Sequence, residues 1–191
     1  MISFGAHIMA VERVQRRLRR STAALDAASI PYAVVGGNAV ASWVGRVDPA
    51  ATRATKDVDI LIRRADTARV TTALASLGFT REDLRDIVLF IDPDEPSKKS
   101  GVRPVWAGER LRPSYNVPSP DVTESERDPE GFSVVSLAGL IRMKLTSHRP
   151  IDQAHILDML SVGLIDQRVR ATLPMELLSR LDALEALQSK Q

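Results

Sequence analysis

The clearest indication of the fold is in residues 32–40, Tyr32-Ala33-Val34-Val35-Gly36-Gly37-Asn38-Ala39-Val40. Its first residues form a short apolar run typical of a buried strand, and the two glycines end that run. Helical composition resumes at Asn38, whose side chain is suited to cap the new helix. The sequence therefore predicts a strand, a glycine turn and a helix in direct succession.

A second strand is predicted in Thr55-Lys56-Asp57-Val58-Asp59-Ile60-Leu61-Ile62, residues 55–62. Because alternate side chains of a strand share one face, Asp57 and Asp59 should project together while Val58 points into the core. Two carboxylates held this close raise each other's pKa unless a cation lies between them. Carboxylate oxygens without His or Cys nearby favour Mg²⁺ or Mn²⁺ over zinc.

The glycine turn fits the same candidate site. Without a Cβ, Gly36 and Gly37 allow the backbone to approach a triphosphate closely, and the following helix offers free N–H groups to anionic oxygens. Each motif alone has an ordinary explanation, as a turn or as surface carboxylates. Their order along the chain, with Arg53 and Lys56 beside the carboxylates, favours a site for a divalent ion and a polyphosphate.

Gly36-Gly37-Asn38-Ala39-Val40 with Arg53-x-Thr55-x-Asp57-x-Asp59 resembles the signature of the DNA polymerase β-like nucleotidyltransferases. The resemblance covers residues 30–63 closely and is nearest to the AbiEii-type toxin nucleotidyltransferases. It implies an α/β (α+β) fold, with a nucleotidyltransferase-type mixed β-sheet flanked by helices. It also implies transfer of a nucleoside monophosphate from an NTP to a hydroxyl, with Mg²⁺ or Mn²⁺ as cofactor.

The resemblance assigns roles to residues of both motifs. It implies that Asp57 and Asp59 are catalytic and hold the metal. The residues that it implies for the nucleotide are Gly36, Gly37, Asn38, Thr55 and Lys144.

Lys144 belongs to a second motif, residues 144–152, which is similar to the basic-then-acidic helical motif of those toxins. In that interpretation Lys144 is also catalytic, because its ammonium offsets the charge of the triphosphate. Asp152, and Asp158 six residues beyond it, would hold the helices or the lysine in place. The alternative is a surface lysine and an Asp152 that caps a helix.

The family normally supplies a third carboxylate from a later strand, as general base or as a ligand of a second metal. The strand expected in residues 102–107 has no acid. The nearest candidates are Asp92, which has the alternative of opening a turn, and Glu109, a loop residue within reach of neighbouring arginines. This departure leaves open a catalytically degenerate nucleotide-binding or regulatory module on the same fold.

The chain is predicted to have two parts, a nucleotidyltransferase core in residues 1–135 and a C-terminal helical segment packed on it in residues 136–191. The core should begin with an amphipathic helix over residues 9–28, whose arginine-rich face we expect to be solvated. Further strands are expected in residues 87–91, 102–107 and 132–135. The leucine-rich residues 173–187 indicate either packing on the domain or a helical surface for a partner.

Composition restricts the class of protein. The 191 residues are 44% hydrophobic and 26% charged, as in soluble globular proteins. A net charge of +2 excludes a histone-like binder, and the lack of cysteine excludes disulfides and thiolate zinc sites. No apolar run approaches the length of about 18 residues that indicates a membrane span, and no signal-peptide pattern is present. We expect a cytoplasmic protein with an RNA or protein acceptor, an antitoxin as a further partner, and no membrane partner.

Overall fold

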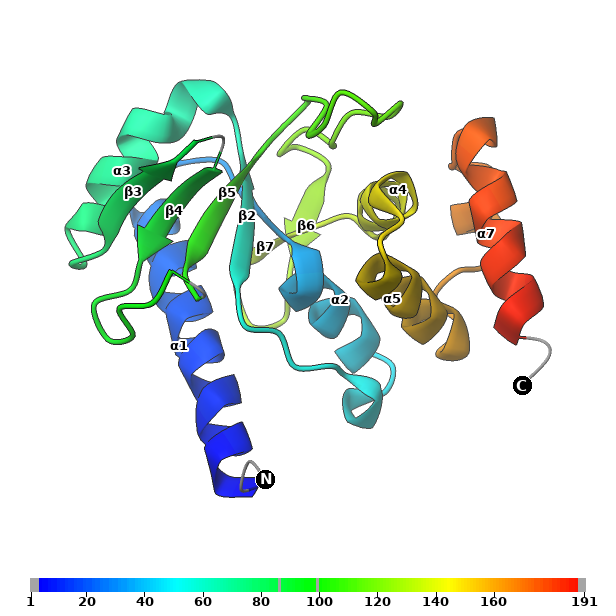
Figure 1. Cartoon of the computed structure of the whole chain (residues 1–191), viewed down its shortest axis with the longest axis horizontal. Coiled ribbons are helices and arrows are strands. Elements are labelled where there is room, and N and C mark those ends of the chain that lie inside the picture. Colours follow the sequence, from blue (N-terminus) through cyan, green and yellow to red (C-terminus); the bar gives the residue numbers. More distant parts are fainter. Residues whose placement is uncertain (1–3, 86, 99, 189–191) are drawn as a thin grey trace.

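Figure 1 shows a computed structural model of the chain, which describes residues 4–85, 87–98 and 100–188. Within these ranges the strands form one seven-stranded mixed sheet in the order β3-β4-β5-β2-β1-β7-β6. The predicted mixed sheet flanked by helices is therefore confirmed. The strands are β1 Ala33–Val35, β2 Val58–Ile62, β3 Thr80–Leu84, β4 Ile87–Ile91, β5 Val102–Trp106, β6 Ser125–Arg127 and β7 Ser133–Val135.

Helices surround this sheet and continue beyond it. They are α1 Phe4–Ala27, α2 Gly36–Gly45, α3 Thr67–Ala75, α4 Leu137–Ser147, α5 Pro150–Ser161, α6 Gln167–Ala171 and α7 Met175–Gln188. Short 3-10 helices span Pro49–Ala51 and Arg64–Asp66. None of the helices in the described ranges combines the length and the apolar composition that crossing a bilayer requires.

Strands β1, β2 and β5 form the centre of the sheet. Strand β2 pairs antiparallel with β1 and parallel with β5, and β1 pairs parallel with β7. The apolar residues of β1 and β2 are buried, as in strands that are covered on both faces. Asp59 is the residue of β2 that is not fully buried, so it stands out within an otherwise apolar strand.

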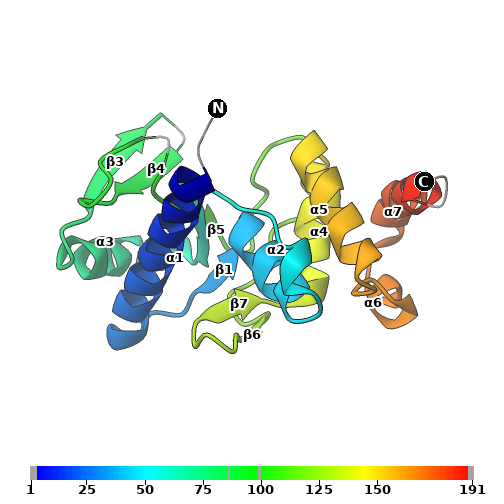
Figure 2. The same ribbon diagram turned by 90° about the horizontal axis from the view of Figure 1, so that it is seen from below.

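The helices place the end of β1 at the middle of the molecule. Helices α1 and α3 pack together beside β2 and β5, whereas α2 starts directly at the end of β1 (Figure 2). Helix α2 contacts α4 and α5, and α7 contacts α4 and α5 in turn. The C-terminal helices therefore extend from the sheet on the side of α2 (Figure 1).

The leucines of α7 are explained by packing within the chain. Leu177, Leu181 and Leu184 are buried in the same hydrophobic cluster as the central strands. Arg180 of α7 also donates hydrogen bonds to the carbonyls of Leu145 and Thr146, at 2.6 and 2.9 Å. Helix α7 thus holds the end of α4, a helix that lines the candidate site.

The arginine-rich helix differs from its prediction. Arg17 of α1 is fully buried, and it donates to Asp92 Oδ2 and to the carbonyl of Lys56, both at 3.2 Å. Arg20 binds the other oxygen of Asp92 at 3.1 Å. The prediction of a solvated face is therefore wrong for Arg17, because its side chain is buried in an ion pair with Asp92, the residue that follows β4.

The strands expected in residues 87–91, 102–107 and 132–135 correspond to β4, β5 and β7. Strand β5 tolerates Pro104 because β4 pairs with β5 through Phe90 and Val102, before the proline is reached. Strands β3 and β6 were not predicted. Both are short edge regions rich in charged residues, so they lack apolar alternation.

Candidate active site

Asp59 lies in the central part of the sheet, between two neighbouring strands. In register it faces Val35, the last residue of β1, on one side and Arg103 of β5 on the other. Val58 and Ile60, its neighbours along β2, are buried. The alternation of side chains therefore directs Asp59 to the opposite face of the strand.

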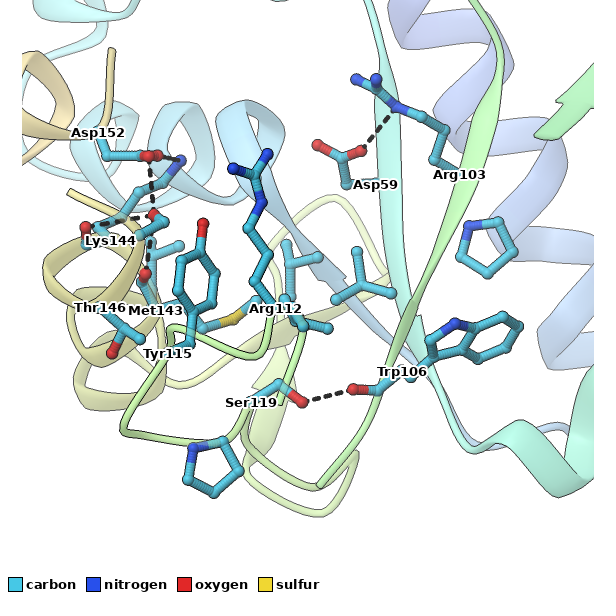
Figure 3. A pocket seen from close by; sticks show the side chains of 18 of the residues that line it. Asp59, Arg103, Trp106, Arg112, Tyr115, Ser119, Met143, Lys144, Thr146 and Asp152 are labelled. Atoms are coloured by element: carbon cyan, nitrogen blue, oxygen red, sulfur yellow. Dashed lines mark hydrogen bonds and ion pairs between the residues drawn. The ribbon is translucent and has the colours of Figure 1, made fainter. Parts of the chain in front are cut away.

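One guanidinium joins the two aspartates. Arg103 Nε donates to Asp59 Oδ1 at 3.2 Å, and Arg103 Nη2 donates to Asp57 Oδ2. Asp57 and Asp59 therefore lie on the same side of the chain, in agreement with the spacing of one residue between them. Figure 3 shows the contact of Asp59 with Arg103.

The first glycine lies directly against the carboxylate of Asp59. Gly36 has a φ of +69°, and a Cβ on it would lie 2.2 Å from Asp59 Oδ2. A Cβ on Gly37 would lie 2.9 Å from Thr55 Oγ1. At residue 36, only glycine both adopts the left-handed backbone conformation readily and leaves room for the carboxylate of Asp59. The two glycines thus allow the start of α2 to lie directly against Asp59 and Thr55.

Asp59 lines a cavity of about 350 Å³ (Figure 3). Strands β2 and β5 and the start of α2 border it on one side, α4 on the other, and the loop of residues 107–124 closes a third side. The size is within the usual range for small-ligand sites. Its charged lining residues are Arg103, Arg112, Lys144, Arg149, Asp59 and Asp152.

Lys144 is held in this cavity by a buried carboxylate. Its Nζ donates to Asp152 Oδ1 at 2.9 Å, and only 6% of Lys144 is exposed. Asp152 also accepts from Ser147 Oγ at 2.7 Å and from Arg149 Nε at 2.7 Å. Burial alone would raise the pKa of Asp152, but Arg149, Lys144 and Ser147 together hold that pKa well below its usual range. Asp152 therefore stays ionised and fixes the lysine.

The pKa of Asp59 is raised above its usual value by burial, which the nearby cations offset only in part. Burial raises the pKa of Asp59, the positive charges of Arg103 and Lys144 counteract this rise, and the charge of Asp57 adds to it. Arg149 also interacts electrostatically with Asp59. The ionised form of Asp59 thus depends on nearby cations, and a further cation beside it would stabilise that form.

The donor set fits one divalent ion. Mg²⁺ in phosphate-binding sites commonly uses one or two carboxylates, and water and substrate phosphates complete its coordination. Asp57 and Asp59 provide this pair. Within residues 4–85, 87–98 and 100–188, no group of three or more His, Cys, Asp or Glu side chains is placed to hold a metal.

Three of the residues predicted for the nucleotide, Gly37, Asn38 and Thr55, do not line this cavity. Asn38 does not cap α2, because its Nδ2 donates to the carbonyl of Asp57 at 2.7 Å, and no side chain caps the helix at Val35. Thr55 packs against Gly37 and, with Asn38, lines a second cavity of about 240 Å³ between α1 and α2. Asn38 and Thr55 thus contact the backbone beside the glycines from outside the main cavity. Gly36, Asp59 and Lys144 line that cavity together.

Neither candidate for the third carboxylate joins the aspartate pair. Asp92 is buried in the ion pairs with Arg17 and Arg20. Glu109 follows the C-terminal end of β5 and pairs with Arg64 through hydrogen bonds of 2.8 and 2.6 Å, whereas Asp57 lies near the other end of that strand. Both candidates are therefore corrected to structural ion pairs. Arg103 occupies the place on β5 that faces Asp59 in register.

Asp158 also acts as a structural partner. It accepts two hydrogen bonds from Arg53, one of them at 2.9 Å, and so joins α5 to the loop before β2. Sequence reasoning missed Arg103, Arg112 and Tyr115. Arg103 carries one signal, a charge inside an apolar strand, whereas Arg112 and Tyr115 come from an irregular loop. Figure 3 shows both loop side chains between Lys144 and Asp59.

Solved structures share this fold. The solution structure of the antibiotic-resistance factor ANT(2'')-Ia aligns with a TM-score of 0.57 at 19% identity, covering 95% of this chain and 100% of that one. The crystal structure of ANT(2'')-Ia in complex with adenylyl-2''-tobramycin gives a TM-score of 0.53 at 18% identity, over 92% and 98%. No protein-family model and no curated protein matches the sequence. The likeness establishes the fold, a mixed sheet flanked by helices, as the sequence predicts.

Proposed function

We propose that this protein is a nucleotidyltransferase that uses Mg²⁺ or Mn²⁺ to move a nucleoside monophosphate from an NTP to a hydroxyl acceptor. The observation that carries this proposal is the convergence of Asp57, Asp59 and Gly36 at the start of α2, beside a cavity that also holds Lys144. The shared fold supports it, since ANT(2'')-Ia has been crystallised with a compound that carries an adenylyl group.

The phosphates of the NTP would lie between α2 and α4. No side chain in the described part of the chain caps α2 at Val35, so the amides of its first turn are available to an anion. Lys144 has three N–H donors, of which one is directed to Asp152. The lysine can therefore bind a phosphate oxygen without leaving its carboxylate partner.

The divalent ion would be held by Asp57 and Asp59, and when bound it neutralises phosphate charge and orients the α-phosphate. In the reaction the acceptor oxygen bonds to the α-phosphorus, pyrophosphate leaves, and the hydroxyl proton passes to water. Positioning and charge neutralisation account for most of the acceleration in phosphoryl transfer. Gly36, Lys144 and the two aspartates supply both.

The charge of the cavity favours an anionic acceptor. Arg103, Arg112, Lys144 and Arg149 line it against two acidic residues, Asp59 and Asp152. The RNA backbone is attracted by such a lining, whereas an amine-rich compound such as tobramycin is repelled. We therefore propose RNA as the acceptor in preference to an aminoglycoside or a protein.

The second candidate function is nucleotide binding without transfer. It is favoured by one observation: Arg103 faces Asp59 in register on β5, and neither Asp92 nor Glu109 reaches the aspartate pair. Without a third carboxylate, activation of the acceptor hydroxyl is weak. The protein would then act as a regulatory module that responds to bound nucleotide.

Transfer of label separates the two functions. The wild-type protein and the Asp59→Asn variant are incubated with each α-³²P-labelled NTP, Mg²⁺, and either total RNA, a protein extract or tobramycin. We expect label in RNA with the wild type and none with Asp59→Asn. Crosslinking of labelled NTP to the protein without transfer to any acceptor would support the binding module, and equal transfer by both proteins would refute the role of Asp59.

A toxin role with an antitoxin partner belongs to the same proposal, and the resemblance to AbiEii-type toxins supports it. Expression of the wild-type protein in a bacterial host should arrest growth, and Asp59→Asn should relieve the arrest. Normal growth at equal levels of both proteins would remove the toxin role while leaving the nucleotidyl transfer to the label assay.

A further inference from the structure

We propose that Arg103 is a built-in counter-ion of the Asp57–Asp59 pair, which makes the binding of a divalent ion depend on a polyphosphate bound beside it. This inference rests on the proposed function, because it concerns the same two carboxylates. In this proposal Arg103 determines whether the two carboxylates are free to bind a metal ion.

The geometry places Arg103 where a metal ion would compete with it. The guanidinium donates from Nε to Asp59 Oδ1 at 3.2 Å and from Nη2 to Asp57 Oδ2. These are oxygens that an ion shared by the two carboxylates would need. The register of β5 on β2 sets Arg103 directly opposite Asp59, so the contact follows from the pairing of the strands.

Arg103 also has room to move. Its side chain is 39% exposed, and the side chains of Asp57 and Asp59 are 28% and 25% exposed. By contrast, the side chain of Arg17, which holds Asp92, is 0% exposed. Arg103 lines the same cavity as Gly36 and Lys144, so a guanidinium that leaves the carboxylates stays within the proposed phosphate site.

The coupling follows from charge. A divalent ion alone has to displace charge-assisted hydrogen bonds and then leaves a guanidinium next to a dication. A polyphosphate removes this obstacle, because its oxygens bind the ion and also accept the planar fork of the freed guanidinium. Metal and polyphosphate should therefore bind with positive coupling, which by linkage is the same whichever binds first.

The test measures binding rather than transfer. Binding of Mn²⁺ alone is followed by the electron paramagnetic resonance signal of the free ion, and binding of α,β-methylene-ATP is measured by calorimetry with and without Mn²⁺. The proteins are the wild type, Arg103→Gln, Arg103→Lys and Asp59→Asn. Arg81→Gln is the matched control, because Arg81 pairs with Asp83 on β3 and removing it changes the net charge equally.

We expect Arg103→Gln to bind Mn²⁺ alone about tenfold more tightly than the wild type, a change of about 1.4 kcal/mol. The same variant should bind the nucleotide analogue more weakly, and Arg103→Lys should lie between the two. A purely structural role of Arg103 would weaken both ligands together. Arg81→Gln should match the wild type in both measurements.

Two failures are distinguishable. If Arg103→Gln and Arg103→Lys leave the affinity for Mn²⁺ unchanged or lower it, while Asp59→Asn abolishes Mn²⁺ binding, the counter-ion role is overturned and the proposed function stands. If Asp59→Asn binds Mn²⁺ and the analogue as the wild type does, both the proposed function and the inference are overturned.

Discussion

Oδ2 of Asp59 lies 2.2 Å from the point where a Cβ on Gly36 would be built. Val35, the last residue of β1, pairs in register with Asp59 of β2, so Gly36, the first residue of α2, lies directly against the carboxylate. Any side chain at residue 36 would displace the group to which we assign the metal.

Gly36→Ala should therefore destabilise the protein more than an ordinary glycine substitution. Gly108 is the matched control, because its φ of +71° is similar and nothing lies within 4 Å of its Cβ position. Gly108→Ala should lower the free energy of unfolding by about 1–2 kcal/mol, and Gly36→Ala by about 3 kcal/mol or more, because overpacking adds to the strain. Urea denaturation measures both, and equal losses would contradict the close contact with Asp59.

Asp92→Ala should reduce stability without acting on the chemistry. Its removal leaves the fully buried Arg17 with less charge compensation, which costs about 3 kcal/mol. Glu109→Gln, at an exposed ion pair, should change stability by less than about 0.5 kcal/mol. Neither should change label transfer per folded molecule. A folded Asp92→Ala protein that has lost transfer would restore this residue as the third carboxylate.

Lys144→Met should weaken nucleotide binding and also destabilise the protein. Loss of the ammonium removes a charge-assisted contact with phosphate, so affinity for α,β-methylene-ATP should fall about tenfold. Lys98→Met is the control, since Lys98 forms a surface ion pair with Glu82 and neither residue lines the cavity of Lys144. If calorimetry gives the same affinity for Lys144→Met and the wild type, Lys144 only supports Asp152.

His155 predicts a pH dependence of stability. Burial and the charge of Lys144 lower the pKa of His155 from 6.5 to about 4. Between about pH 4 and 6.5, His155 therefore binds a proton in the unfolded chain but not in the folded one. The stability that the neutral His155 contributes is complete above about pH 6.5 and is lost as the pH falls to about 4. Its slope is at most about 1.4 kcal/mol per pH unit.

Urea denaturation between pH 4 and 8 should show that slope in the wild type and a smaller one in His155→Gln. The lowered pKa of Asp152 acts in the same direction but at lower pH, below the ordinary range of an aspartate, so it does not obscure the window of the histidine. Identical slopes in the two proteins would show that His155 does not titrate as its burial implies.

The local pattern of the sequence was sufficient for the elements that carry the aspartates and the glycines. Residues 58–62 form β2 because an apolar run in a buried strand is a local property, and the glycines mark the start of α2 for the same reason. The partners of charged residues were not predictable. Arg103 reaches Asp59 only through the register of two strands far apart in sequence, and Arg17 is buried by residues after β4.

The residues predicted for the site do not all lie in the same place. Gly36, Asp59 and Lys144 lie in one cavity, whereas Asn38 supports the backbone of Asp57 and Thr55 packs behind Gly37. A motif in sequence indicates which residues are near the two glycines, but the side on which each residue lies depends on how α2 packs against α4 and α5.

A crystal structure of the protein with α,β-methylene-ATP and Mn²⁺ tests the proposed metal and phosphate sites together. We expect an anomalous Mn²⁺ peak in contact with both Asp57 and Asp59, phosphates between the start of α2 and Lys144, and Arg103 turned from the carboxylates to the phosphates. A nucleotide bound elsewhere, or an Mn²⁺ peak that touches neither aspartate, would contradict the proposed site.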